Sequence, residues 1–582
     1  MPHTTRYQIL STKLSYTPNL WDVVVFLILL ALLSVLAWGA NQMAVPYQVG
    51  ETITISLDPW NLPNYALRTV LRMFFALICS LLFTFIVAPI AAKNRSAGKL
   101  IIPAIDILQS IPVLGMLSIT IVAFIKLFPG SLLGAECAAI FAIFTSQVWN
   151  MTLGLYQSLK MVPEELQDAG SVFHLKAWQR FWRIEVPFAM PGLLWNTMAS
   201  LSAGWFFVVA SEAISVSNQN IWLPGIGSYI REAINQADLN AVFYAIMAMF
   251  IVILLYDQLL FRPLLAWMGK FSTELQEEHE RNQSWFYNFL TKRIWFQCCL
   301  ESFSRGQELF LNPPFSRNKP AFQQPPSSPS KYNLSLIAEW LWNASLVVGI
   351  IIAALWLINF ITQSVSFDEI NRVFYLGAIT AFKVAILIIL ASILWVPIGV
   401  WIGMNTRISA FLQPFTQFLA AFPVNLIYPI IVTLIVQFKL NVEIWSTPLM
   451  ILGTQWYILF NIIAGTKAIP RDLKLATKNL GVKGWLRWKR LILPAIFPYY
   501  ITGATTAAAG CWNASIVADT LSWGNHTFVA TGLGSYIAQY TTEGDFPRIA
   551  LGISVMCIYV IIINRLIWHK LYQLASKRFI LE

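Results

Sequence analysis

Two carboxylates, Glu212 and Asp519, stand in stretches of sequence that are otherwise almost entirely apolar. Each follows a tryptophan by seven residues, Trp205 in one case and Trp512 in the other. An ionised carboxylate inside a membrane costs about 2.5 to 3.5 kcal/mol on insertion scales, so it usually faces a bundle interior or water. The two acids therefore either line and gate a translocation route, or hydrogen-bond neighbouring helix ends and shape an outer gate. Because they would repel an anion, a role in a gate is favoured over direct anion binding.

Two basic residues, Arg72 and Lys383, also lie early in apolar segments. Each could attract an anion at the mouth of a pathway, or extend its charged end to the membrane interface. Trp205 and Trp512 suit either helix packing or a platform for a substrate. An intramembrane enzyme built on Glu212 or Asp519 with His526 lacks a nucleophile–base set or an HExxH motif, and no cysteine spacing indicates a metal site.

The elements that carry these residues are predicted to be membrane-spanning helices. Hydrophobic residues make up 57% of the 582-residue chain and charged residues 12%, about half the charged share of a soluble domain. Apolar stretches of about 20 residues recur, which is the length a helix needs to cross the hydrocarbon core. The predicted spans lie near 20–42, 66–92, 100–127, 132–156, 188–212 and 240–262, and near 336–360, 374–403, 409–437, 445–465, 496–520 and 547–569. The fold class is therefore all-α integral membrane, with about 12 transmembrane helices.

The distribution of charge predicts how the chain is oriented. The net charge of +11 resides in short loops between spans, as in topology determinants, and does not indicate nucleic-acid binding. One basic loop contains Lys93, Arg95 and Lys99, whereas Glu51 and Glu136 lie in alternate loops. Since cytoplasmic loops carry excess Lys and Arg, we expect both termini and the segment 270–333 to be cytoplasmic. That segment is polar and rich in proline and serine, which is typical of a linker.

An internal repeat divides the chain into two modules of the same topological sense. Prolines, tryptophans and loop glycines recur at a spacing of 307 residues: Trp205 matches Trp512, Glu212 matches Asp519, and the Gly-x-Gly-Ser-Tyr-Ile string from Gly225 recurs from Gly532. Upstream the spacing is 311, and Arg72 matches Lys383. Shared hydrophobicity does not align such residues, so the sequence predicts a parallel duplication. The predicted modules are residues 1–269 and 334–582, joined by the linker 270–333.

A basic loop between the fourth and fifth spans recurs in both modules, at 161–187 and 468–494. A proline, Pro163 or Pro470, stands where a helix would begin, and apolar residues follow at helical spacing. A second short helix precedes Pro187 and Pro494. The sequence therefore predicts an exposed helix–turn–helix in each module.

These loops resemble the EAA loop of permeases in ATP-binding-cassette importers of type I. That pattern is EAA, three residues, Gly, nine residues and I-x-L-P. The EAA positions fall on Asp168, Ala169 and Gly170 in one loop and on Leu475, Ala476 and Thr477 in the other, with the glycine position at His174 and Gly481. In this family the loop helix docks on an ATPase subunit. The resemblance thus implies coupling residues at Pro163, Leu166, Asp168, Ala169, Gly170, His174, Ile184, Pro187, Pro470, Leu473, Leu475, Ala476, Thr477, Gly481, Leu491 and Pro494.

The wider resemblance is to the nitrate, sulfonate, taurine and bicarbonate branch of these permeases. It rests on the Leu108–Pro112 string after Pro103 and on the Gly-x-Gly-Ser-Tyr-Ile strings. It implies a fused permease of the bacterial inner membrane that imports a small anionic solute by alternating access. Its expected partners are two cytoplasmic ATPase subunits, a periplasmic or lipid-anchored solute-binding protein and membrane lipid. The chain contains no GxxxxGK[ST] phosphate loop, so ATP and Mg²⁺ are expected on the partner subunits, and no cofactor on this chain.

One alternative function is that of a secondary transporter, because two parallel repeats also describe such carriers. That alternative gives no reason for two cytoplasmic helical docking loops. Co-purification of ATPase subunits would distinguish the two.

Overall fold

The computed structural model describes residues 53–109, 113–216, 219–268, 332–524 and 526–578, together with residues 34, 37–43, 46, 286 and 289. Most of the span predicted near 20–42 and most of the linker 270–333 lie outside the described residues.

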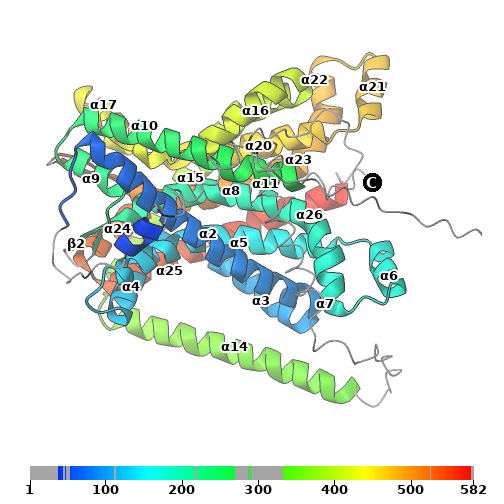
Figure 1. Ribbon diagram of the computed structural model, residues 1–582, viewed down its shortest axis with the longest axis horizontal. Coiled ribbons are helices and arrows are strands. Elements are labelled where there is room, and N and C mark those ends of the chain that lie inside the picture. The colour runs from blue at the N-terminus through cyan, green and yellow to red at the C-terminus, as the bar shows by residue number, and fades with distance from the viewer. Residues whose placement is uncertain are drawn as a thin grey trace, which may run out of the picture.

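The first module consists of long helices with short elements between them (Figure 1). Their bounds are η1 Pro59–Asn61, α2 Leu62–Lys93, α3 Arg95–Leu108, α4 Val113–Leu127, α5 Leu133–Lys160, α6 Glu164–Val172, α7 Ala177–Arg180, η2 Phe181–Glu185, α8 Val186–Glu212, β1 Ala213–Val216, β2 Gln219–Trp222, α9 Ile226–Asn235, α10 Leu239–Tyr256, η3 Asp257–Phe261 and α11 Arg262–Met268.

The second module has a similar order, except that three helices take the place of α5. Its elements are α14 Tyr332–Thr362, α15 Phe367–Met404, α16 Thr406–Ala421, η7 Val424–Leu426, α17 Tyr428–Gln437, α18 Val442–Ser446, α19 Leu449–Leu452, α20 Gln455–Lys467, α21 Arg471–Asn479, α22 Gly484–Arg487, η8 Trp488–Ile492, α23 Leu493–Ala518, β3 Thr520–Trp523, β4 His526–Val529, α24 Leu533–Glu543, α25 Phe546–Ile563, η9 Asn564–Trp568 and α26 His569–Arg578.

The duplication seen in the sequence is also present in the structure. From α6 to η3, each element begins 307 residues before its counterpart in the second module: α6 and α21, α8 and α23, β1 and β3, and α10 and α25 all follow this rule. In both modules a short antiparallel hairpin, β1–β2 or β3–β4, follows the helix that carries the predicted acid. The chain is thus built from two copies of one helical unit.

Seven helices in the described ranges are long and apolar enough to cross a membrane, or eight if the bent pair Val442–Leu452 and Gln455–Lys467 counts as one span. The spans predicted as continuous over 100–127 and 409–437 are in fact each divided, into α3 and α4 and into α16 and α17. In the second module the break falls at Phe422, which has ψ 127° and precedes Pro423. A residue before proline is driven out of the helical region, so one straight span cannot form there.

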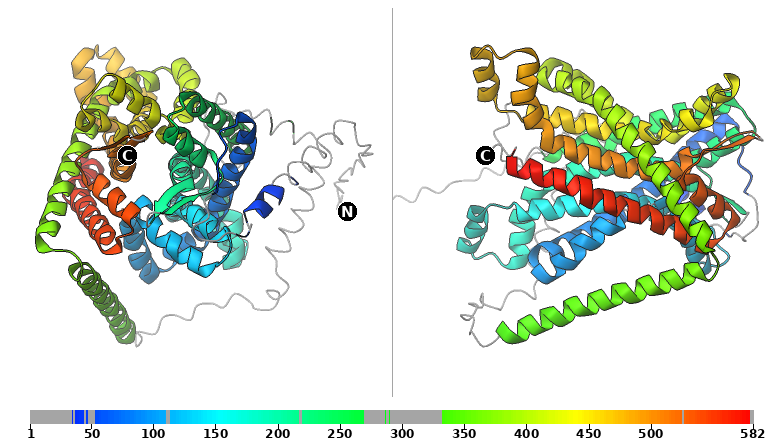
Figure 2. Two further views of the ribbon diagram at one scale, coloured as in Figure 1. Left: turned by 90° about the vertical axis from the view of Figure 1, so that its left-hand side faces the viewer. Right: turned by 180° about the vertical axis from the view of Figure 1, so that it is seen from behind.

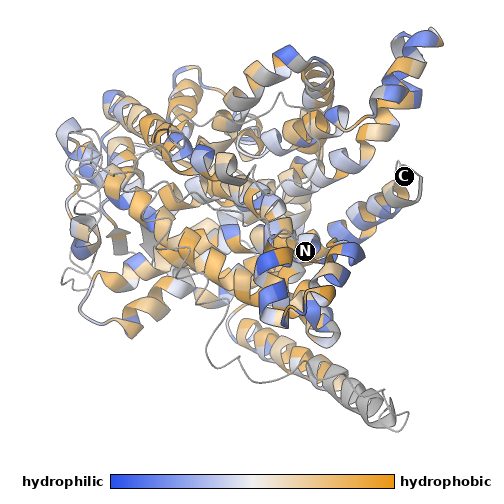
Figure 3. Ribbon diagram, turned by 45° about the vertical axis from the view of Figure 1, so that its right-hand side comes forward, coloured by the Kyte–Doolittle hydropathy of each residue, from blue (hydrophilic) through white to orange (hydrophobic). Residues whose placement is uncertain are grey.

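The outward faces of the long helices are apolar, as a lipid-facing surface requires. Leu82 and Ile86 on α2 are about three-fifths exposed, and Ile389 and Ile393 on α15 are similarly exposed. Figure 3 shows hydrophobic residues along the long helices of both modules, and hydrophilic residues gathered where α6 and α21 project. Together with the helix lengths, this surface makes the chain a multi-pass membrane protein.

The two modules meet at one end of the molecule and diverge at the other (Figures 1 and 2). We call these the hairpin end, with α9, α24 and the two β-hairpins, and the docking end, with α6, α7, α21 and α22. The cores join toward the hairpin end, where Leu426 and Trp523 of the second module pack into the core of the first. At the docking end, α21 lies at the upper right of the view in Figure 1, and α6 lies well below it on the same side.

One packing detail appears in both modules with the two partners exchanged. On α5, Gly154 lies against Asn196 of α8, and a Cβ at Gly154 would overlap the Asn196 amide. At the corresponding crossing the asparagine is Asn461 on α20, and the glycine is Gly503 on α23, where a Cβ would lie 3.0 Å from Cβ of Asn461. One large and one small residue therefore fill each crossing, and either helix can supply the large one.

Candidate functional site

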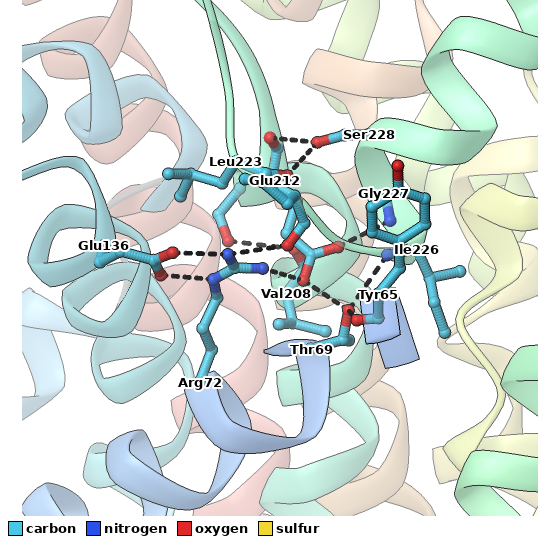
Figure 4. Close-up of polar contacts among 12 residues, drawn as sticks. Tyr65, Thr69, Arg72, Glu136, Val208, Glu212, Leu223, Ile226, Gly227 and Ser228 are labelled. Carbon is cyan, nitrogen blue, oxygen red and sulfur yellow. Dashed lines mark hydrogen bonds and ion pairs between the residues drawn. The ribbon is translucent and has the colours of Figure 1, made fainter. Parts of the chain in front are cut away.

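A buried guanidinium organises the hairpin end of the first module. Arg72 on α2 is fully buried, so it does not extend to a membrane interface as one sequence interpretation allowed. Its Nε and Nη2 donate to the Glu136 carboxylate at 2.5 and 2.7 Å, and its Nη1 donates to Oε1 of Glu212 at 2.6 Å (Figure 4). Nη2 also donates to the Pro224 carbonyl at 3.0 Å. One side chain thus binds α5, the end of α8 and the loop before α9.

Glu212 continues this network to the start of α9. Its carboxylate accepts hydrogen bonds from the Thr69 hydroxyl at 2.7 Å and from the Gly227 N–H at 2.6 Å. The Thr69 hydroxyl oxygen in turn accepts from the Ile226 N–H at 3.1 Å. Both N–H groups belong to the first turn of α9, where the helix itself offers no partner, and the partial positive charge of that end favours a carboxylate.

We name Thr69, Arg72, Glu136, Glu212 and the α9 amino terminus the first staple. Its charged members are fully buried and hydrogen-bonded to one another, the condition under which buried charges are stable in an apolar environment. Figure 4 shows the acids converging on Arg72 from different helices. The structure thus places Glu212 at a junction of helix ends, one of the two arrangements considered from the sequence.

The second module has a looser counterpart, the second staple, made of Thr380, Lys383, Glu443 and Asp519 with the α24 amino terminus. The Lys383 ammonium donates to the Thr531 carbonyl at 2.8 Å and to Oδ1 of Asp519 at 3.4 Å, and it lies 3.6 Å from Glu443. The Glu443 side chain is 44% exposed. Oδ2 of Asp519 is buried and accepts no hydrogen bond from the described residues. Lysine carries all three of its donors on one nitrogen, so it lacks the planar fork with which arginine binds two carboxylates.

The acids Glu136 and Glu443 were missed as site residues by sequence reasoning, which placed Glu136 in a loop. Glu136 actually lies in the first turn of α5, and Glu443 in the first turn of α18. The two positions are 307 residues apart, the same spacing that matches Glu212 with Asp519. Extending that register upstream from the docking loops would have found them.

The paired tryptophans belong to the core and do not face an open site. Trp205 is 2% exposed and meets the Tyr256 ring edge-on, with centroids 5.3 Å apart. Trp512 is 3% exposed and stacks with Tyr559 at 6.4 Å. Of the two sequence interpretations, their surroundings match helix packing.

The docking end presents the helix–turn–helix predicted in each module. The helices α6 and α21 each have nine residues and follow a proline, Pro163 or Pro470, with ψ 144° or 140°. Each helix ends two residues before a left-handed residue, His174 with φ 50° or Gly481 with φ 64°. The glycine position of the loop pattern is therefore a left-handed position in both modules, and only the second copy has the residue best suited to it.

The predicted coupling residues separate into an exposed set and a packed set. Asp168 and Ala476 are exposed and Ala169 is partly exposed, whereas Gly170 is buried, with a Cβ there meeting Ile184 at 3.0 Å. The remaining exposed or half-exposed members are Pro163, Leu166, His174, Pro470, Leu473, Leu475, Thr477 and Gly481, and those packed at the base of the loop are Ile184, Pro187, Leu491 and Pro494. Flanking apolar residues protrude as well: Phe173 is 74% exposed and Leu480 78%.

The first docking loop is also tied to α2 by charge. Glu185 lies 2.9 Å from Lys93 and 3.4 Å from Arg180, and the Lys93 ammonium lies over the Phe181 ring at 4.7 Å. At the matching positions the second module has Met404 and Ile492. Elsewhere in the described ranges, no three His, Cys, Asp or Glu side chains converge as metal ligands.

Comparison with known proteins agrees with this architecture. The family model of the binding-protein-dependent transport system inner membrane component matches twice, over residues 80–261 and 395–579, once in each module. A nitrate import permease protein of Synechocystis is 28% identical over 156 residues, 27% of this chain and 52% of the relative. A bicarbonate transport system permease protein of Synechococcus elongatus is 24% identical over 188 residues, 32% of this chain and 64% of the relative.

A further relative, a nitrate import permease protein of Leptolyngbya laminosa, is 22% identical over 249 residues, 40% of this chain and 83% of the relative. The first two alignments thus span about half to two-thirds of the length of those relatives.

Proposed function

Because the chain belongs to the family of binding-protein-dependent transport system inner membrane components, we propose that it is a fused, two-module permease of an ATP-driven importer. Two separate ATPase subunits, which bind ATP and Mg²⁺, dock on α6 and α21. A solute-binding protein delivers solute at the hairpin end. The chain itself performs no covalent chemistry.

The observation that supports this proposal is the repeated docking loop. Two helices of the same length and end geometry project from the two modules, and their apolar residues have no partner within the described chain that buries them. Exposed apolar residues in such a cluster are typical of a protein interface. A secondary carrier would gain nothing from two such surfaces.

The contacts within and between the modules support alternating access. Within the first module the helix ends are joined by the charged first staple. Between the modules, single uncharged acceptors predominate: Arg231 donates to the Ser522 hydroxyl at 2.9 Å, and the Gly524 N–H to the Ile234 carbonyl at 2.8 Å. These contacts and the apolar packing of Leu426 and Trp523 are expected to give way during transport, while the charged first staple keeps its helix ends joined.

The direction of coupling follows from the shape. The modules are joined at the hairpin end and apart at the docking end (Figure 1). Closure of an ATPase dimer would draw α6 and α21 together and part the hairpin end, so solute would enter from outside and leave toward the ATPases. We place the chain in the bacterial inner membrane, with both termini and the docking end cytoplasmic.

The solute we propose is a small anion of the nitrate, bicarbonate, sulfonate or taurine class. The names of the relatives include nitrate and bicarbonate transport. The pathway and gate candidates Arg72, Lys383, Glu212 and Asp519 act as staples that hold the gate helices, and they do not ligate the solute.

The test is ATPase activity of the chain co-purified with its cytoplasmic partners in lipid, comparing wild type with Ala169→Arg plus Ala476→Arg. Both alanines lie on the docking helices and are at least partly exposed, so arginine there should obstruct docking without disturbing the bundle. We expect ATPase subunits with wild type and their loss, or loss of solute-stimulated hydrolysis, in the variant. Uptake driven by an ion gradient with no ATPase bound would instead establish a secondary carrier.

A further inference from the structure

The two docking helices have the same shape and opposite charge. The helix α6, with sequence EELQDAGSV, contains three acidic residues and no basic one, whereas α21, with sequence RDLKLATKN, contains three basic residues and one acidic one. Glu164, Glu165 and Asp168 are exposed on α6, and Lys478 is exposed on α21. On α21 the acid Asp472 is exposed as well, at the position that matches Glu165, and Lys474 is partly exposed, so acidic residues are in excess on α6 and basic residues on α21.

The two docking helices share their geometry and differ mainly in charge. Their proline caps, nine-residue lengths and left-handed exits coincide, as described above, and an apolar residue recurs at Leu166 and Leu473. A groove shaped for one helix is therefore shaped for the other. The matching positions differ at Glu164 and Arg471, Gln167 and Lys474, Asp168 and Leu475, and Ser171 and Lys478.

The surroundings reinforce the contrast. On the second loop, the Arg487 guanidinium is close enough to Lys474 to act with desolvation in lowering the pKa of that lysine, so like charges gather at this helix. On the first loop, the position matching Lys474 is the uncharged Gln167. Both loops carry basic residues beyond these helices, Arg180 in the first matching Arg487 in the second, but a positive-inside bias does not account for the three exposed acids on α6.

Resting on the proposed function, we infer that the two helices recruit two different ATPase subunits: one with a basic docking groove for α6, the other with an acidic groove for α21. A single kind of groove would face opposite charges at its two copies, and like charges across an interface are strongly unfavourable. Opposite charges instead assign each subunit to one module.

The experiment exchanges charge while preserving shape. In one variant, α6 takes the charged pattern of α21 through Glu164→Arg, Gln167→Lys, Asp168→Leu and Ser171→Lys. In the reciprocal variant, α21 receives Arg471→Glu, Lys474→Gln, Leu475→Asp and Lys478→Ser. A third chain carries both sets. Each full-length chain is co-expressed with the ATPase subunits of its host, and the purified complex is analysed by native mass spectrometry.

Wild type should contain one copy each of two ATPase chains. The first variant should lose the α6 partner by roughly tenfold or more and gain a second copy of the other subunit, because charge complementarity governs the choice. The reciprocal variant should do the opposite, and the doubly exchanged chain should regain one copy of each. As a steric control that changes no charge, Ala169→Trp or Ala476→Trp, tested singly, should remove one subunit by obstruction and recruit no replacement.

Two outcomes would overturn this inference while leaving the importer intact: two copies of one ATPase on wild type, or unchanged subunit composition in both exchanged chains. If the α21 exchange instead released bound anionic lipid and kept both ATPases, the basic helix would be a lipid contact. Absence of any ATPase from wild type would contradict the proposed function itself.

Discussion

At the residue scale, the two staples show what an arginine does that a lysine does not. Arg72 divides its donors among Glu136, Glu212 and the Pro224 carbonyl, whereas Lys383 reaches its acids at 3.4 and 3.6 Å. The guanidinium fork matches two carboxylates at once, and the ammonium does not. The same register position therefore produces a closed network in one module and an open one in the other.

We expect Arg72→Met to be far more damaging than Lys383→Met. Without Arg72, two fully buried carboxylates face each other uncompensated, which should lower the free energy of unfolding by about 3–5 kcal/mol. Lys383→Met leaves the half-exposed Glu443 with its two hydrogen bonds from Thr531 but takes the lysine away from the buried Asp519 carboxylate, so a loss of about 1–3 kcal/mol is expected. Thermal unfolding of the purified chains in one detergent measures the difference, with Arg72→Lys as the intermediate control. If Arg72→Met and Lys383→Met lowered the free energy of unfolding equally, the first staple would stabilise the chain no more than the second.

At the element scale, the exchanged glycine and asparagine show how helix crossings tolerate sequence change. Gly154 and Asn196 fill the α5–α8 crossing, and Asn461 and Gly503 fill the α20–α23 crossing. The side-chain amide of each asparagine also donates a hydrogen bond, at 2.8 Å, to a carbonyl one turn earlier on its own helix. The amide therefore has a hydrogen-bond partner whichever of the two helices carries the asparagine. What each crossing requires is the summed volume of the pair.

A double-mutant cycle tests this requirement. Gly154→Asn alone places a second asparagine where even a Cβ overlaps, and we expect a loss of about 1–3 kcal/mol from overpacking. Adding Asn196→Gly reproduces the arrangement of the second module and should recover most of that loss. The free energies of unfolding of wild type, the two single variants and the double variant give the coupling energy between Gly154 and Asn196. Simple additivity would mean that the two residues do not share one space.

At the scale of the whole molecule, the contacts between the modules belong to the hairpin end and should break during transport. A short bismaleimide should cross-link Arg231→Cys with Ser522→Cys in a chain whose native cysteines are replaced by alanine, because the two side chains are hydrogen-bonded. Trapping the complete transporter with ATP and vanadate should reduce the yield several-fold, as the hairpin end opens.

The matched control is Glu369→Cys with Arg548→Cys, whose side chains are both partly exposed and form an ion pair at 2.8 Å between α15 and α25 of one module. This pair should cross-link equally in both states, because each module moves as a unit. If the yield at Arg231→Cys with Ser522→Cys stays constant while solute is transported, the path does not open at this end.

The internal repeat is what made so much predictable from sequence. The prolines and glycines at fixed spacing predicted the duplicated helical modules and both docking helices, and the family comparison confirms the two-module architecture. Proline caps and left-handed positions are encoded by a few neighbouring residues, so a local pattern is sufficient to place them. Hydropathy was sufficient for the membrane class because a spanning helix must be apolar along its whole length.

Only the tertiary structure decided what the buried charges do. Arg72 meets Glu136 and Glu212 across 64 and 140 residues of chain, a convergence that depends on how four segments pack. From sequence, a lone arginine in an apolar segment is equally consistent with extension to the interface, because the periodicity of one helix says nothing about what faces it. The division of the span predicted at 409–437 was hidden for a related reason: hydropathy averages over a proline-containing break that the backbone cannot bridge as one helix.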